Sequence, residues 1–193
     1  MMDDYIWVFL WPVFGLLQNE VYGAEEIGEC MNITNDLSTF SRCCRLPELE
    51  LSEEKKAIAE SCHRATIADQ PVPFTEEEEE EMYECFQECY LNATNWLNAD
   101  LKPDENVIIA EYNEELKNFP QWKESIIRTV QTCIANDYTK PEAKCKSGAF
   151  QFGNCLERNM FLNCPEDSWQ GTDEICVNTK RTFEKCMINS NKY

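Results

Sequence analysis

The residues of this 193-residue chain best suited to form covalent bonds are its twelve cysteines, and two kinds of chemistry are open to them. Cysteines that bind a metal usually come in tight Cys-x-x-Cys pairs accompanied by histidines. No two cysteines here have that spacing, and His63 is the single histidine. An even number of widely spaced cysteines is instead typical of disulfides in a secreted domain. The sequence therefore predicts six disulfides and no metal site, and it leaves their connectivity open. The twelve are Cys30, Cys43, Cys44, Cys62, Cys85, Cys89, Cys133, Cys145, Cys155, Cys164, Cys176 and Cys186.

The remaining polar residues offer no distinct catalytic set. A serine or cysteine nucleophile would need His63 as its base, and that histidine follows Cys62 in a segment rich in lysine and glutamate, which is typical of a surface position. A secreted phospholipase A2 would place His-Asp soon after a Cys-Cys pair, but here Cys43-Cys44 is followed by Arg45-Leu46-Pro47. Calcium loops of the EF-hand type are absent from the sequence as well. We therefore expect no enzymatic activity and no cofactor.

The first residues indicate where the chain is sent. The run from Tyr5 to Leu17 is apolar, too short to span a bilayer comfortably and of the right length for a signal-peptide core. We expect cleavage after Gly23, so that residues 1–23 are a signal peptide and the mature chain is secreted into extracellular fluid. Asp3 and Asp4 stand where a positive charge is usual, which leaves a miscalled start codon or a buried first helix as alternatives.

The net charge of −19 argues against nucleic acids and anionic membrane surfaces as partners. Two N-glycosylation sequons, Asn32-Ile33-Thr34 and Asn92-Ala93-Thr94, are compatible with secretion. An acidic run covers residues 76–81. We interpret it as the first turn of a helix, where carboxylates are stabilised by the helix dipole, followed by a solvated face.

Hydrophobic periodicity predicts helices, whereas signals for strands are poor. The clearest helix begins at Thr75, which can act as N-cap while Glu78 completes a capping box, and its apolar face carries Met82, Cys85 and Phe86. Further helices are expected to begin at Ser52, Asp104, Pro120, Pro141 and Thr172, and a weaker one lies around residues 33–40. The helix from Pro141 should end before Pro165.

Nearly every cysteine falls on the apolar face of a predicted helix, as disulfides between helices require. The expected fold is therefore all-α, a single compact multi-helix domain over residues 24–193. Each disulfide would add about 2–4 kcal/mol, mainly by restricting the unfolded chain. Cross-links of this strength allow a domain to keep a cavity in its centre.

The cysteine pattern resembles that of a known family. Cys85 and Cys89 are separated by three residues within one predicted helix. The second half of the chain carries Cys145, Cys155, Cys164-Pro165, Cys176 and Cys186, with Asn-Met-Phe-Leu-Asn before the Cys-Pro pair and Trp169 after it. This arrangement resembles the twelve-cysteine Plus-C class of insect odorant-binding proteins, over roughly residues 30–188.

The resemblance implies a helical shell around an apolar pocket, with residues from about 165 to 193 as a C-terminal extension tethered by disulfides. It matches Cys62, Cys85 and Cys89 to the first three family cysteines and implies a Cys62–Cys89 bridge. The later matches remain open. The fourth to sixth cysteines are either Cys133, Cys145 and Cys155, or a set whose last two members are Cys155 and Cys164.

The function implied by the resemblance is that of a non-enzymatic carrier of small hydrophobic molecules, such as odorants or other semiochemicals. A chemosensory receptor or a second copy of the chain would be its protein partner. The alternative is a secreted helical interaction module of saliva or reproductive fluid, without a ligand cavity. Each expected wall residue could instead be plain core, since aromatic stripes at helical spacing usually mean packing. The expected pocket wall is Phe86, Ile109, Tyr112, Trp122, Ile126, Val130, Phe150 and Phe152.

Overall fold

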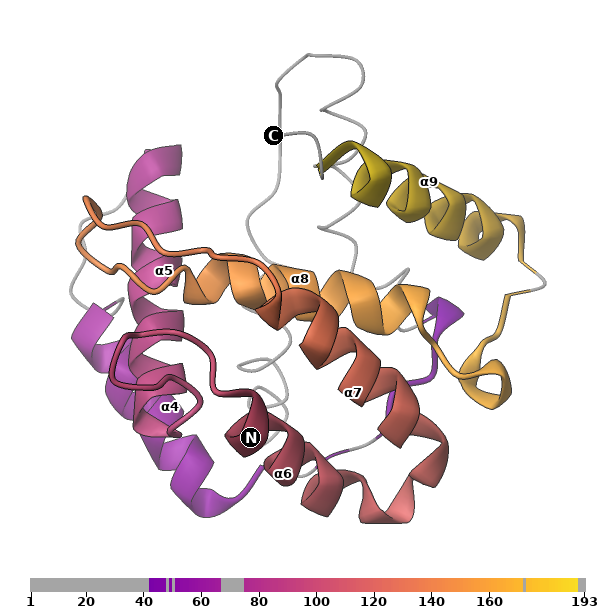
Figure 1. The fold of residues 1–193 in the computed structure, drawn as a ribbon, viewed down its shortest axis with the longest axis horizontal. Coiled ribbons are helices and arrows are strands. Elements are labelled where there is room, and N and C mark those ends of the chain that lie inside the picture. The colour runs from indigo at the N-terminus through magenta and orange to yellow at the C-terminus, as the bar shows by residue number, and fades with distance from the viewer. Residues whose placement is uncertain (1–41, 48, 50, 67–74, 172, 191–193) are drawn as a thin grey trace, which may run out of the picture. The chain divides into compact units, whose positions relative to one another are not determined.

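The structure, a computed structural model, describes residues 42–47, 49, 51–66, 75–171 and 173–190. Within these ranges the chain is helical, with two isolated β-bridges and no strand, so the all-α prediction is confirmed (Figure 1). The predicted signal peptide, the weak helix around residues 33–40, Cys30 and the Thr172 cap lie outside the described residues. The elements are α4 (Glu53–Thr66), α5 (Glu76–Ala93), α6 (Glu105–Glu115), the 3-10 helix η2 (Leu116–Asn118), α7 (Pro120–Ile134), α8 (Ala149–Leu162), the 3-10 helix η3 (Glu166–Ser168) and α9 (Glu174–Ser190).

Three predicted helix starts are confirmed in their atomic detail. The hydroxyl of Thr75 accepts a hydrogen bond from the Glu78 N–H at 3.2 Å, and the Glu78 carboxylate accepts one from the Thr75 N–H at 2.8 Å. Asp104 caps α6 by accepting from two backbone N–H groups. Ser52 Oγ accepts from the Lys55 N–H at 3.2 Å. These pairs lie within one helical turn, which is why the sequence alone could predict them.

The helix predicted from Pro141 is wrong in its start, because α8 begins at Ala149 and the preceding residues form turns. Gly148 has a φ of +67°, in the left-handed region that a right-handed helix does not use. In addition, the Glu88 carboxylate accepts hydrogen bonds from the N–H groups of Lys146 and Ser147 at 2.6 and 2.7 Å. Hydrogen bonds to α5 therefore replace the helical ones here. The predicted end before Pro165 is confirmed, since α8 ends at Leu162.

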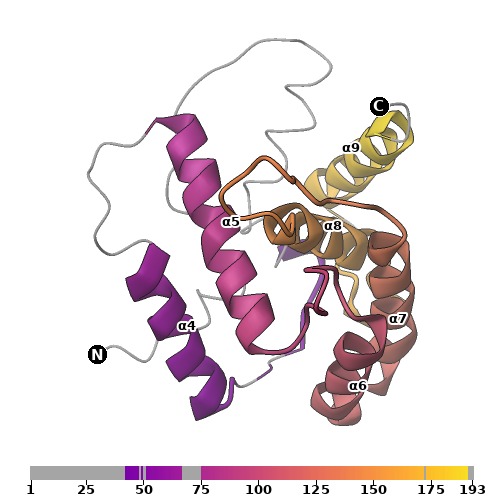
Figure 2. The ribbon, with the colours of Figure 1, turned by 60° about the vertical axis from the view of Figure 1, so that its left-hand side comes forward.

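The chain divides into two compact units, and the larger one covers residues 49–156. In it α4 packs against α5, and α6 packs against α7 (Figure 2). Its core contains Phe86 of α5, Trp122 and Val130 of α7, and Phe152 of α8. Three disulfides cross-link this unit, namely Cys62–Cys89, Cys85–Cys145 and Cys133–Cys155.

The smaller unit combines residues up to 48 with residues 157–193. Two disulfides cross-link this unit. Cys43 is bonded to Cys176 of α9, and Cys44 is bonded to Cys164, which lies just before η3. Its aromatic core centres on Phe161, whose ring lies 5.5 Å from that of Trp169 and 5.2 Å from that of Phe183. The described helices include none that is both long and apolar enough to cross a membrane.

The five disulfides of the described residues give pairings that the sequence left open. Cys62 and Cys89 are bonded, as the resemblance implied. The larger unit's six cysteines pair entirely among themselves, whereas Cys164 pairs with Cys44 of the smaller unit. The match to the fourth to sixth family cysteines stays a prediction. The side chains of Cys30 and Cys186 are not among those described. That these two cysteines are also disulfide-bonded stays a prediction.

Candidate functional site

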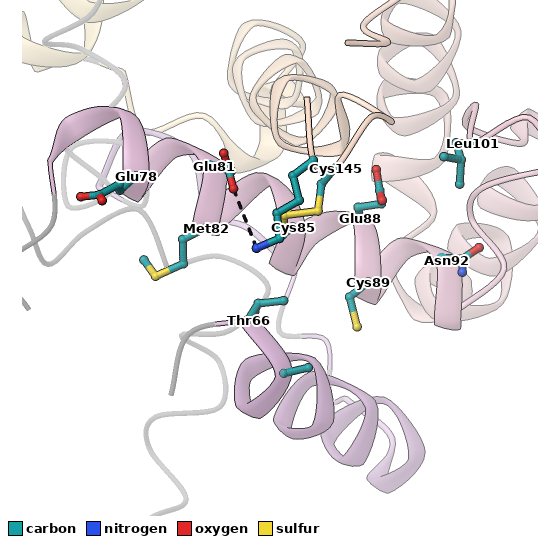
Figure 3. A pocket seen from close by; sticks show the side chains of 12 residues that line it. Thr66, Glu78, Glu81, Met82, Cys85, Glu88, Cys89, Asn92, Leu101 and Cys145 are labelled. Carbon is teal, nitrogen blue, oxygen red and sulfur yellow. Dashed lines mark ion pairs between the residues drawn. A yellow bond between two sulfur atoms is a disulfide. The ribbon is translucent and has the colours of Figure 1, made fainter. Parts of the chain in front are cut away.

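A pocket of about 500 Å³ lies in the larger unit beside α5 (Figure 3). Its volume falls within the range of roughly 300–1,000 Å³ that is usual for small-molecule sites. Four segments contribute to it: the end of α4, one face of α5, the loop between α5 and α6 that holds Leu101, and the loop that precedes α8. It is lined by Ala65, Thr66, Glu78, Glu81, Met82, Cys85, Glu88, Cys89, Asn92, Leu101, Lys144 and Cys145.

The α5 residues of the lining share a face because they recur every three or four positions, which is one helical repeat. Disulfides attach α4 and the loop before α8 to this face. Cys89 is bonded to Cys62 of α4, and Cys85 is bonded to Cys145 of the loop before α8. The pocket therefore has covalently connected walls, and its shape depends on the two bridges staying intact.

The lining is polar as well as apolar, with three carboxylates and one ammonium group. Lys144 Nζ lies 3.9 Å from Glu81, and both side chains are exposed (Figure 3). The backbone hydrogen bond from Thr75, followed by that from its hydroxyl, lowers the pKa of Glu78. Met82, Leu101 and the disulfide sulfurs supply the apolar surface. This lining could hold a ligand by its shape and by hydrogen bonds. Its side chains do not pair a nucleophile with a base.

Elsewhere the described residues do not bring three His, Cys, Asp or Glu side chains together in a way that could hold a metal ion. The single histidine, His63, lies on α4 and is half-buried rather than on the open surface that its neighbours indicated.

A buried carboxylate of α5 anchors α8. The Glu84 side chain accepts hydrogen bonds from the N–H groups of Ala149 and Phe150, at 2.7 and 3.3 Å, and from Ser147 Oγ at 3.3 Å. Burial raises the pKa of Glu84, and these donors partly offset the effect. The first turn of α8 leaves backbone N–H groups without helical partners, so Glu84 acts as an N-cap supplied by another helix.

The eight predicted wall residues all lie in the larger unit, and none of them lines this pocket. Phe86, Trp122, Ile126, Val130 and Phe152 are buried, and the other three, Ile109, Tyr112 and Phe150, are half-buried. They come from α5, α6, α7 and α8, so the structure gathers them from four helices into one unit. The pocket-lining residues were missed because four separate segments form the pocket, and the periodic pattern of α5 does not show which other segments lie beside it.

A charged cluster joins α4 to α6 in the same unit. Lys55 Nζ donates to the carboxylates of Glu111 and Glu115, the latter at 2.5 Å, and all three side chains are less than 30% exposed. The indole N–H of Trp96 donates to Glu111 at 2.9 Å, and the Trp96 ring lies 5.4 Å from that of Tyr112. Burial, reinforced by the two carboxylates, raises the pKa of the Tyr112 hydroxyl.

Comparison with known proteins finds a distant relative. The chain is 26% identical over 172 residues to General odorant-binding protein 67 of Anopheles gambiae, and the aligned region covers 84% of this chain and 79% of the relative. No family model matches the chain, and no solved structure matches it. The all-helical fold of the described residues and the five disulfides among them are consistent with the fold of insect odorant-binding proteins.

Proposed function

We propose that this protein is a secreted, non-enzymatic carrier that binds small hydrophobic molecules and transports them through aqueous extracellular fluid. The observation that carries the proposal is the similarity to the Anopheles odorant-binding protein, which extends over most of both chains. Odorants and other semiochemicals are the proposed ligands. A chemosensory receptor or a second copy of the chain is the proposed protein partner.

The disulfide framework supports a carrier in physical terms. Three bridges connect α4 to α5, α5 to the loop before α8, and α7 to α8 within the larger unit. A cavity removes packing contacts and costs stability, and disulfides restore stability by restricting the unfolded chain. A ligand that enters such a cavity gains about 25 cal/mol for each Å² of apolar surface buried, before the costs of ordering.

We place the ligand against the eight predicted wall residues rather than in the pocket beside α5. The pocket lining carries Glu78, Glu81 and Glu88, and burying an apolar ligand against carboxylates would remove water from charged groups without replacing it. The eight wall residues carry no charge. Because most of them are buried, binding requires their side chains to move apart.

Binding of a neutral fluorescent probe, N-phenyl-naphthylamine, to purified and delipidated protein tests this function. We expect a dissociation constant in the micromolar range, or about −8 kcal/mol, and displacement by long-chain odorants. Affinity should depend weakly on salt, since the acidic charge of the chain does not hold a neutral ligand. If the wild-type protein binds no probe, and native mass spectrometry of secreted material finds no retained lipid, the carrier proposal fails.

A second candidate is a secreted helical module that binds another protein through its surface. One observation favours it: Phe86, Trp122 and Phe152 are each 1% exposed, as they would be in a filled core. Such a protein would bind no apolar probe in its native state. The probe experiment therefore separates the two candidates.

A further inference from the structure

Asn92 lies in the last turn of α5 and is exposed at the edge of the pocket (Figure 3). It begins the sequon Asn92-Ala93-Thr94, whose threonine is the C-cap of the helix. The next residue, Asn95, has a φ of +62°, so the chain turns away directly after the sequon. An exposed asparagine at a helix end followed by a turn leaves room for a bulky substituent.

The fold makes no use of the side-chain amide of Asn92. Within the described part of the chain, no hydrogen bond engages it. By contrast, the amide nitrogens of Asn136 and Asn163 donate to backbone carbonyl groups at 3.2 and 2.8 Å. A substituent on the Asn92 amide nitrogen would therefore break no hydrogen bond of the folded protein.

The threonine of the sequon has a structural role that variants can separate from glycosylation. Thr94 Oγ1 donates to the carbonyl oxygens of Tyr90 and Leu91 at 3.0 and 3.3 Å. Serine would keep both the hydroxyl and the sequon, whereas alanine would remove both.

We propose that Asn92 carries an N-linked glycan. In the transfer, the bond between the first sugar carbon and the diphosphate of a lipid-linked oligosaccharide breaks, and that carbon bonds to Asn92 Nδ2. The nitrogen loses one proton, and the lipid diphosphate leaves. The proposal rests on the secretion contained in the proposed function. It adds a large hydrophilic group at the edge of the pocket beside α5.

The test is secretion of the full chain from cultured mammalian cells, with Asn32→Gln removing the other sequon. Four forms are compared: Asn32→Gln alone, and Asn32→Gln combined with Asn92→Gln, Thr94→Ala or Thr94→Ser. Peptide mass spectrometry before and after treatment with an N-glycanase, which converts a glycosylated asparagine to aspartate, reports occupancy at position 92. Protein retained in the cells is scored in the same way, because the glycan is attached before secretion.

We expect a glycan on Asn92 in most molecules of the Asn32→Gln and Asn32→Gln/Thr94→Ser forms, and none in the other two. An unmodified Asn92 in the Asn32→Gln form, both in the medium and inside the cells, would overturn the proposal. Probe binding is measured separately. If the protein is unmodified but binds N-phenyl-naphthylamine, only the glycan proposal fails. If the protein is glycosylated but binds no probe, only the carrier proposal fails.

Discussion

Glu84 of α5 accepts a hydrogen bond from the backbone N–H of Ala149 at 2.7 Å, although 65 residues separate the two in the chain. Glu84 is 3% exposed, and its carboxylate also receives the Phe150 N–H and the Ser147 hydroxyl. Through this residue α5 sets the position at which α8 begins. The proposed wall residues Phe150 and Phe152, in the first turn of α8, therefore depend on a side chain of another helix for their placement.

Changing Glu84 to Ala should lower the free energy of unfolding by about 2 kcal/mol, because two backbone N–H groups and a hydroxyl lose their buried acceptor. Glu84→Gln should cost less, since its side-chain oxygen can still accept. Urea denaturation followed by circular dichroism measures both. The matched control is Glu81→Ala on the same helix, which removes an exposed carboxylate 3.9 Å from Lys144. Equal losses for the Glu84→Ala and Glu81→Ala variants would contradict the anchoring role.

A variant pair distinguishes the interior wall from the pocket beside α5. Trp122→Ala should weaken binding of N-phenyl-naphthylamine roughly tenfold, or about 1.4 kcal/mol, if the ligand contacts the indole. Met82→Gln, which changes the pocket lining, should leave the affinity near that of the wild type. Titration of probe fluorescence gives both constants, and circular dichroism checks that each variant retains its helix content. The opposite ranking would place the ligand in the pocket.

Lys55 should contribute more to stability than a surface lysine. Lys55→Met leaves Glu111 and Glu115 half-buried without their shared cation, so we expect a loss of about 2 kcal/mol in the free energy of unfolding. The control is Lys117→Met, which removes an exposed i,i+3 pair with Glu114 and should cost less than about 0.5 kcal/mol. Combining Lys55→Met with Glu115→Gln should recover part of the loss. If the effects of the two changes on the free energy of unfolding simply add, Lys55 and Glu115 are not coupled.

Glu157 of α8 should make stability depend on pH near neutrality. Burial raises the pKa of Glu157 from its ordinary value of 4.5 to about 7, against the attraction of Arg158. The folded state therefore favours the protonated form. The contribution of the protonated Glu157 to the free energy of unfolding is complete below the pKa that the group has in the unfolded chain. It is lost as the pH rises through about 7.

Glu157→Gln should accordingly raise the melting temperature relative to the wild type at about pH 8, and change it little at about pH 5. Scanning calorimetry at both pH values measures the difference. Glu166→Gln, at an exposed position of η3, is the control and should show no such dependence. A gain of the same size at both pH values would show that the Glu157 carboxyl does not titrate in this range.

The disulfide framework predicts that the denatured, unreduced protein takes up no iodoacetamide. After full reduction, twelve additions should appear on a chain that begins at Ala24, as intact mass spectrometry can measure. Two or more free thiols before reduction would contradict the six-bridge prediction. A secreted chain that retains Met1 would contradict the predicted signal peptide.

The sequence by itself determined the features that depend on neighbouring residues. The caps at Ser52, Thr75 and Asp104 each join groups within one helical turn, so local pattern was sufficient to locate them. Hydrophobic periodicity identified the buried face of α7, whose Trp122, Ile126 and Val130 are all buried. The cysteine spacing indicated disulfides rather than a metal site, and the resemblance added the Cys62–Cys89 bridge.

The tertiary structure decided the features that depend on residues far apart in the chain. Periodicity shows which face of a helix is buried, but it does not show what packs against that face. The start of α8 was therefore misplaced, because it depends on Glu84 and Glu88 some sixty residues earlier, which the residues around Pro141 do not reveal. The pairing of Cys133 with Cys155 and the pocket beside α5 were undetermined for the same reason. In each case the partners meet only once the chain has folded, and the free energy that selects them is a property of the packed structure.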